Sequence, residues 1–192
     1  MHPVFSFERK FVSGRKDFFD EIRSVAHLKL IHPFVADIKV FKEKPDLTGT
    51  RYFVTFTNGI RLIEEVACFE RDQLAIKVIT YDKNIPYFFI RIYRTKSDNI
   101  DGGTIGMQLL CETKQQKIIF KETFPAIYRM GNLFFPEVLK GINSFCITGQ
   151  PPEKLTISPD GQVVAASLMS HQQVRSPHEY LPSSFFRETA KT

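Results

Sequence analysis

Apolar segments joined by very short links dominate the first three quarters of this chain. Between residues 34 and 112, apolar and polar side chains alternate, which is the period of a β-strand. Together with a loosely alternating run at the start, they predict strands near residues 4–12, 34–44, 50–57, 60–70, 73–81, 86–95 and 103–112. Because short links leave no room for a crossover, successive strands must pair antiparallel. The pattern therefore limits the fold to a large antiparallel sheet.

Two stretches have the spacing of helices instead. Residues 17–31 predict one or two short helices, which end at His32 because the residue before a proline is pushed out of the helical region. Residues 115–145 predict a long helix, and Pro125 and Pro136 predict a kink or a restart within it. Its large apolar side chains recur at steps of three, four or seven: Phe120, Phe124, Ile127, Phe134, Val138, Ile142 and Phe145. The fold class is therefore α+β, with one long helix available to cover the sheet.

The composition changes near residue 147. Of the 19 Phe, only two lie beyond this point, whereas five of the 11 Pro do. We predict a packed domain over 1–146 and an extended, partly ordered tail over 147–192, with a hairpin around residues 158–161. The tail is either a loosely attached peptide or an arm that docks on a protein partner or a second copy through its late apolar residues, Tyr180, Leu181, Phe185 and Phe186.

Composition excludes several classes of protein. A net charge of +5, spread along the chain, is too small to favour a nucleic-acid partner. No apolar run approaches the length of a membrane span, and the N-terminus lacks the features of a secretory signal. The three widely spaced cysteines indicate neither a disulfide framework nor a zinc finger. We therefore expect a cytoplasmic protein with no metal, no cofactor and no integral membrane segment.

The strongest hairpin signal, Asn58-Gly59, suggests a register for the sheet. A two-residue turn there pairs Thr57 with Ile60, and so places Tyr52 opposite Glu65 on the more apolar face. Burial would raise the pKa of Glu65, and Tyr52 would donate a hydrogen bond to it, unless the pair is merely structural or Glu65 pairs with an arginine. A slip of one residue would exchange Glu65 for Glu64.

Arg91 and His32 are further polar candidates. Arg91 alternates with Tyr87, Phe89 and Tyr93, so it either holds a ligand's anionic group inside a cavity or is a solvated surface charge. His32 is either a helix-end residue or an acid/base group at a cavity mouth. No cysteine or serine has the partners of a nucleophilic site, and the segment 101–104 is a turn between strands rather than a phosphate loop.

The order of these elements resembles the helix-grip fold of the START-like superfamily, in its polyketide cyclase/dehydrase and lipid-transport (SRPBCC-type) group. The resemblance rests on FSFERKFVSGRKDFFDEI, on HLKLIHPFV, on GTRYFVTFTNGIRLIEEV and on the long terminal helix. It implies a curved six- to seven-stranded antiparallel sheet wrapped around the C-terminal helix, with two short helices after the first strand. It also implies a cavity between sheet and helix for a hydrophobic small molecule or lipid.

Three functions stay open on these grounds. The first is binding or transport of a hydrophobic ligand by residues that we expect to face the cavity: Tyr52, Val54, Phe56, Ile63, Glu65, Ile76, Phe89, Arg91, Tyr93, Phe120, Phe124 and Ile127. The second is a cyclase- or dehydratase-like reaction, catalysed by Glu65, Tyr52 and His32. The third is protein interaction through the tail.

Overall fold

The computed structural model describes residues 1–12, 18–79, 87–96, 102–123, 125–158 and 162–166. Seven strands form one sheet: β1 (His2–Val12), β2 (Val35–Lys42), β3 (Arg51–Phe56), β4 (Arg61–Glu70), β5 (Gln73–Ile79), β6 (Phe88–Lys96) and β7 (Gly102–Cys111). Between β1 and β2 lie α1 (Phe18–Glu21), the short 3-10 helix η1 (Val25–His27) and α2 (Leu28–Ile31). After β7 come α3 (Lys114–Thr123), α4 (Pro125–Thr148), β8 (Leu155–Ile157) and β9 (Val163–Ala165).

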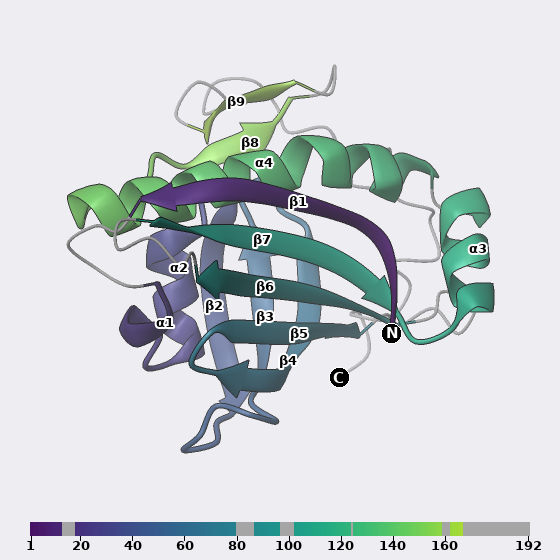
Figure 1. The fold of residues 1–192 in the computed structure, drawn as a ribbon, viewed down its shortest axis with the longest axis horizontal. Coiled ribbons are helices and arrows are strands. Elements are labelled where there is room, and N and C mark those ends of the chain that lie inside the picture. The colour runs from purple at the N-terminus through teal and green to yellow at the C-terminus, as the bar shows by residue number, and fades with distance from the viewer. Residues whose placement is uncertain (13–17, 80–86, 97–101, 124, 159–161, 167–192) are drawn as a thin grey trace.

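The sheet is antiparallel throughout, in the order β1-β7-β6-β5-β4-β3-β2. Strand β1 is an edge strand and pairs with β7, so the strands of this sheet that come first and last along the chain lie side by side (Figure 1). Helix α4 runs along β1 over the sheet, with α3 beyond one end and α1 and α2 towards the other (Figure 1). The predicted helix-grip α+β fold is confirmed.

The two prolines of the terminal helical region behave differently. Helix α3 ends at Thr123 and α4 begins at Pro125, a position where a proline costs no hydrogen bond because the first helical N–H has no partner in the helix. Pro136 lies inside α4, which continues to Thr148. The predicted restart thus occurs at Pro125. The helix then presents Val138, Leu139 and Ile142 to the core.

The turn between β3 and β4 has three residues, so the predicted two-residue turn is wrong. The Phe56 N–H donates to the Ile60 carbonyl (2.8 Å), and the Gly59 N–H donates back to the Phe56 carbonyl (2.9 Å). Gly59 has φ = +84°, the left-handed conformation that a three-residue hairpin loop requires at its last position. The extra residue moves the register by one.

This shift decides which glutamate enters the core. Tyr52 lies opposite Glu64, and Glu65 lies opposite Arg51. Since successive side chains of a strand point to opposite faces, Glu64 is buried at 6% exposure, while Glu65 turns to the outer face. The predicted Tyr52–Glu65 pair is therefore wrong, and the alternative with Glu64 is correct.

A bulge in β4 restores the predicted register between β4 and β5 beyond it. Between Val66 and Cys68 the pairing with β5 shifts, so Phe69 faces Leu74 as predicted while Glu64, not Glu65, faces Val78. The bulge inserts one residue on the β4 side only, which returns the apolar side chains beyond it to the inner face. The turn at Gly59 thus sets the faces of Glu64 and Glu65, and the bulge sets the face of Phe69.

The predicted hairpin near residues 158–161 is confirmed by the pairing of β8 with β9. It is fastened to the main sheet region: the Leu155 N–H donates to the Pro33 carbonyl (3.0 Å), and Thr57 Oγ1 donates to the Leu155 carbonyl (2.6 Å). The boundary at residue 146 stays a prediction. The proposed docking arm around residues 180–186 lies outside the described residues, as do the links near residues 84 and 97–101.

Candidate functional site

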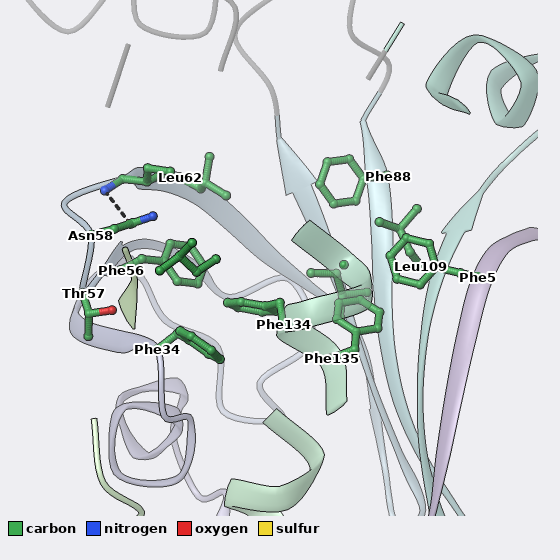
Figure 2. Close-up of a pocket in the computed structure, with 14 residues that line it drawn as sticks. Phe5, Phe34, Phe56, Thr57, Asn58, Leu62, Phe88, Leu109, Phe134 and Phe135 are labelled. Carbon is green, nitrogen blue, oxygen red and sulfur yellow. Dashed lines mark hydrogen bonds between the residues drawn. The ribbon is translucent and has the colours of Figure 1, made fainter. Parts of the chain in front are cut away.

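An apolar pocket lies between the sheet and α4, near the turn from β3 to β4 (Figure 2). Its volume is about 120 Å³. None of the described side chains that line it is ionisable: Phe5, Phe34, Phe56, Thr57, Asn58, Ile60, Leu62, Phe88, Ile90, Leu109, Gly131, Phe134, Phe135 and Ile157. The sheet, α4 and the β8–β9 hairpin, through Ile157, all contribute to this lining.

Phenyl rings form most of the wall and hold one another in place. Phe34 and Phe134 stack with centroids 4.5 Å apart, and Phe56 meets Phe134 edge to face at 5.8 Å. On the other side, Phe5 of β1 packs on Phe135 at 4.9 Å. These are the separations that aromatic pairs prefer, so the wall is packed while the space beside it stays open (Figure 2).

Gly131 brings α4 close to β1 at this pocket. A Cβ atom at this position would lie 2.0 Å from the Phe5 ring, far inside van der Waals contact. The glycine therefore lets the Phe5 ring lie directly against the helix, one turn before Phe135. Any larger residue would push the ring out of this position, and the pocket lies beside it.

Thr57 and Asn58, both half-buried, are the only polar side chains among the described lining residues. The Thr57 hydroxyl already donates to the Leu155 carbonyl. Asn58 Oδ1 accepts the Ile60 N–H at 3.2 Å, the local bond that suits asparagine to a turn. The Asn58 amide nitrogen is left as a free donor at the edge of the pocket.

His32 lies behind the aromatic wall. Its ring is 6.2 Å from the Phe56 ring and 5.3 Å from the Phe134 ring, and Nδ1 accepts the Phe34 N–H at 3.3 Å. Burial, aided by the nearby Lys154 ammonium, lowers the pKa of His32 to about 3. The imidazole is thus neutral near neutral pH, and it supports the wall rather than lining the pocket.

Tyr52 and Glu64 form a buried polar pair on the inner face, outside the pocket lining. Burial raises the pKa of Glu64 to about 7, and the Tyr52 phenol acts in the opposite direction. Burial and the negative charge of Glu64 raise the pKa of Tyr52 well above its usual value. The two groups interact, but Tyr52 Oη is buried without a hydrogen bond of ordinary geometry. Glu65, in contrast, forms an ion pair with Arg51 on the outer face.

Phe89, Arg91 and Tyr93 lie on the outer face, because Phe88, Ile90 and Ile92 of the same strand take the inner one. The Arg91 guanidinium lies 5.1 Å from the centre of the Tyr93 ring, and Tyr93 Oη donates to Glu8. The hypothesis that this face lines the cavity is therefore wrong. Arg91 is instead a half-buried residue of the outer face.

The remaining predicted ligand residues are distributed through the fold. Val54 and Ile76 are buried in the core beside the pocket, and Ile63 lies on the outer face. Phe120 is fully buried and meets Phe88 edge to face at 5.5 Å. Phe124 lies outside the described residues, and the side chain of Ile127 is not described. Among the predicted residues with described side chains, Phe56 alone lines the pocket.

No protein-family model matches this sequence, and no curated protein matches it. Solved structures do match its fold. Truncated norcoclaurine synthase from Thalictrum flavum aligns with a TM-score of 0.53 at 14% identity, over 75% of this chain and 92% of that one. The protein XoxI from Bacillus cereus aligns with a TM-score of 0.52 at 10% identity, over 75% and 94%.

A third match is the di-domain ARO/CYC protein StfQ from the steffimycin biosynthetic pathway, with a TM-score of 0.50 at 13% identity, over 73% of this chain and 50% of that one. The chain has the helix-grip fold. At these identities, the similarity between this chain and the matched structures shows the fold alone. The predicted resemblance to START-like, SRPBCC-type proteins is thus confirmed as a resemblance of fold.

Local sequence patterns did not identify most of the residues that line the pocket. Phe5 and Phe134 belonged to predicted apolar faces, but nothing marked them as lining a space rather than filling the core. Ile157 comes from the predicted tail, and no local signal places it beside β3. Within the described residues, no cluster of His, Cys, Asp and Glu is arranged to hold a metal ion. None of the described helices is long and apolar enough to cross a membrane.

Proposed function

We propose that this protein binds a hydrophobic small molecule in the pocket between the sheet and α4. One observation carries the proposal: a pocket of about 120 Å³ lies between the sheet and α4, and no lining side chain that the structure describes is ionisable. Native interiors are close-packed, and an apolar cavity left empty forfeits contacts that a guest would restore. Norcoclaurine synthase and StfQ have the same fold, which supports a ligand-holding role.

The catalytic alternative loses its main residue. It required Glu65 and Tyr52 at the cavity, but Glu65 pairs with Arg51 on the outer face and Tyr52 lies outside the pocket lining. The buried Glu64 takes the predicted place beside Tyr52, yet it does not line the pocket either. Binding without chemistry is therefore the function that the geometry supports best.

Two neighbouring residues of β4 provide the test. Leu62 lines the pocket, and the next residue, Ile63, points to the other face of the sheet. Leu62→Trp would fill the space, whereas Ile63→Trp adds the same bulk elsewhere. Binding of small apolar compounds is measured by NMR titration of the full chain, after thermal melts have shown that both variants fold.

We expect the native protein and Ile63→Trp to bind an apolar compound with similar affinity, and Leu62→Trp to bind at least about tenfold more weakly, since overpacking excludes a guest. Native mass spectrometry of the gently purified protein adds an independent readout, in which a retained small molecule supports the proposal. If no apolar compound binds, or if Leu62→Trp binds as well as Ile63→Trp, the proposal is wrong.

A further inference from the structure

We infer that the pocket selects a neutral compound with a single ring and one hydrogen-bond acceptor, and that the Asn58 amide nitrogen meets this acceptor. The inference rests on the proposed function and narrows it to a class of ligand. Three properties of the pocket carry it: its size, the lack of an ionisable group among the lining side chains that the structure describes, and one free donor among them.

Size argues for one ring. A volume of about 120 Å³ is close to that of the cavity of about 150 Å³, lined by Leu, Ile and Phe, that binds benzene in another protein. Drug-sized ligands need pockets of about 300 Å³ or more. The pairs Phe34–Phe134 and Phe5–Phe135 are joined by the contact of Phe134 with Phe135 at 6.3 Å, so widening the pocket on this side requires breaking aromatic contacts. We therefore expect a polycyclic compound or a long acyl chain to exceed the volume of the pocket.

The lining argues against a charged ligand. Phe, Leu and Ile side chains surround the space, and the described lining holds no acid and no base. His32 is the titratable ring packed behind Phe56 and Phe134, and it is neutral near neutral pH. An ammonium group placed here would lose its hydration without gaining an ionic partner, and a carboxylate would gain at most the Asn58 amide, so burying either charge costs far more free energy than burial of a ring contributes. Fatty acids and amines are therefore excluded as buried ligands.

The edge of the pocket provides one donor. The Thr57 hydroxyl is committed to Leu155, and Asn58 Oδ1 is committed to the Ile60 N–H. The Asn58 amide nitrogen has no partner, and Asn58 lies beside Phe56 and Leu62 at the turn (Figure 2). A carbonyl or ether oxygen on the ring would satisfy it. A donor of the ligand would reach only the remaining lone pairs of Asn58 Oδ1 and Thr57 Oγ1, two oxygens that already take part in hydrogen bonds, whereas the amide nitrogen has no partner at all.

A matched pair of compounds tests the inference. Acetophenone and α-methylstyrene have the same ring and nearly the same shape, and they differ in a C=O against a C=CH₂ group. Asn58→Asp is the matched variant, because it keeps an oxygen for the Ile60 N–H and removes the amide donor. Dissociation constants are measured by NMR titration for both compounds with the native chain and with Asn58→Asp, and Asn58→Leu serves as an uncharged second variant.

We expect the acetophenone preference of the native protein to exceed that of either variant by about two- to tenfold, the usual worth of one hydrogen bond. Comparing ratios removes the cost of dehydrating the ketone, which is common to all three proteins. Equal ratios in the native protein and a folded variant overturn the role of Asn58. If one variant fails to fold, the other supplies the ratio.

Naphthalene and decanoic acid complete the experiment and separate the two proposals. If either one binds more tightly than both single-ring compounds, the ligand class is wrong, although the pocket still holds a hydrophobic guest. If none of the four compounds binds the native protein, the proposed function itself fails. Binding of the single-ring compounds with weak or no binding of the other two supports both.

Discussion

Replacing Glu64 by glutamine should stabilise this protein at alkaline pH and have much less effect at acidic pH. Glu64 is buried on the inner face of the sheet opposite Tyr52, and its pKa is raised from 4.5 to about 7. The folded state therefore holds the proton more tightly than the unfolded chain does. Between these two pKa values the free energy of unfolding falls as the pH rises, because Glu64 ionises in the unfolded chain but stays protonated in the folded one.

The size of the effect follows from the two pKa values. With 1.36 kcal/mol for each unit, the shift corresponds to about 3 kcal/mol once the pH exceeds both. Between pH 5 and pH 8 the ionisation of Glu64 should cost the folded state about 2–3 kcal/mol. Glutamine imitates the protonated acid and cannot ionise, so the variant escapes this cost. In a chain of this size, the gain corresponds to about 5–10 °C in Tm.

Urea unfolding at several pH values measures the difference between Glu64→Gln and the native protein. The expected result is a difference that grows by about 2–3 kcal/mol from pH 5 to pH 8 in favour of the variant. Glu65→Gln is the control: it makes the same change at the next residue, where it removes a partly exposed ion pair with Arg51 worth about 0–1 kcal/mol. Curves for Glu64→Gln that run parallel to the native curve would refute the reasoning.

Three further substitutions test other parts of the structure. His32→Asn should stabilise the protein by about 2 kcal/mol at pH 5 relative to pH 7. The pKa of His32 is about 3 in the folded state, so protonation of His32 favours the unfolded state as the pH falls through 6.5. Urea unfolding at both pH values measures this gain, and no gain would be seen if His32 were solvated. Gly59→Ala should cost about 1–2 kcal/mol through its positive φ alone, since a Cβ there meets nothing within 4 Å, whereas Gly59→Asn should cost less; equal melts for the two contradict this. Gly131→Ala should displace the Phe5 ring, lower Tm and weaken acetophenone binding; a more stable variant with native affinity would show that the contact yields freely.

The kinds of element and their order along the chain could be predicted from the sequence. Alternation over residues 34–112 identified strands, short links made them antiparallel, and the spacing of Phe120 to Phe145 identified the helical cover. These are properties of neighbouring residues, and local backbone geometry depends on neighbours. The resemblance to the helix-grip fold supplied the packing of the terminal helix on the sheet.

Register and pocket depended on tertiary structure. One extra residue in the turn that ends at Gly59 exchanged Glu65 for Glu64 in the core, and the bulge at Val66–Cys68 then restored the face of Phe69. A strand has a side-chain period of two, so a single inserted residue reverses every assignment until another compensates for it. When both faces of a strand carry apolar side chains, the local pattern does not distinguish the two registers. Only packing against the other elements decides which register forms.

The chain itself determined that there would be a wide sheet, an aromatic-rich helix over it and a hairpin near residue 160. Only the folded molecule decided that the rings of Phe5, Phe34, Phe134 and Phe135 would stand apart around an unfilled space, and that Ile157 would border it. Such a space arises between segments more than a hundred residues apart, where the shapes of several side chains must meet at once. No short stretch of sequence carries that information.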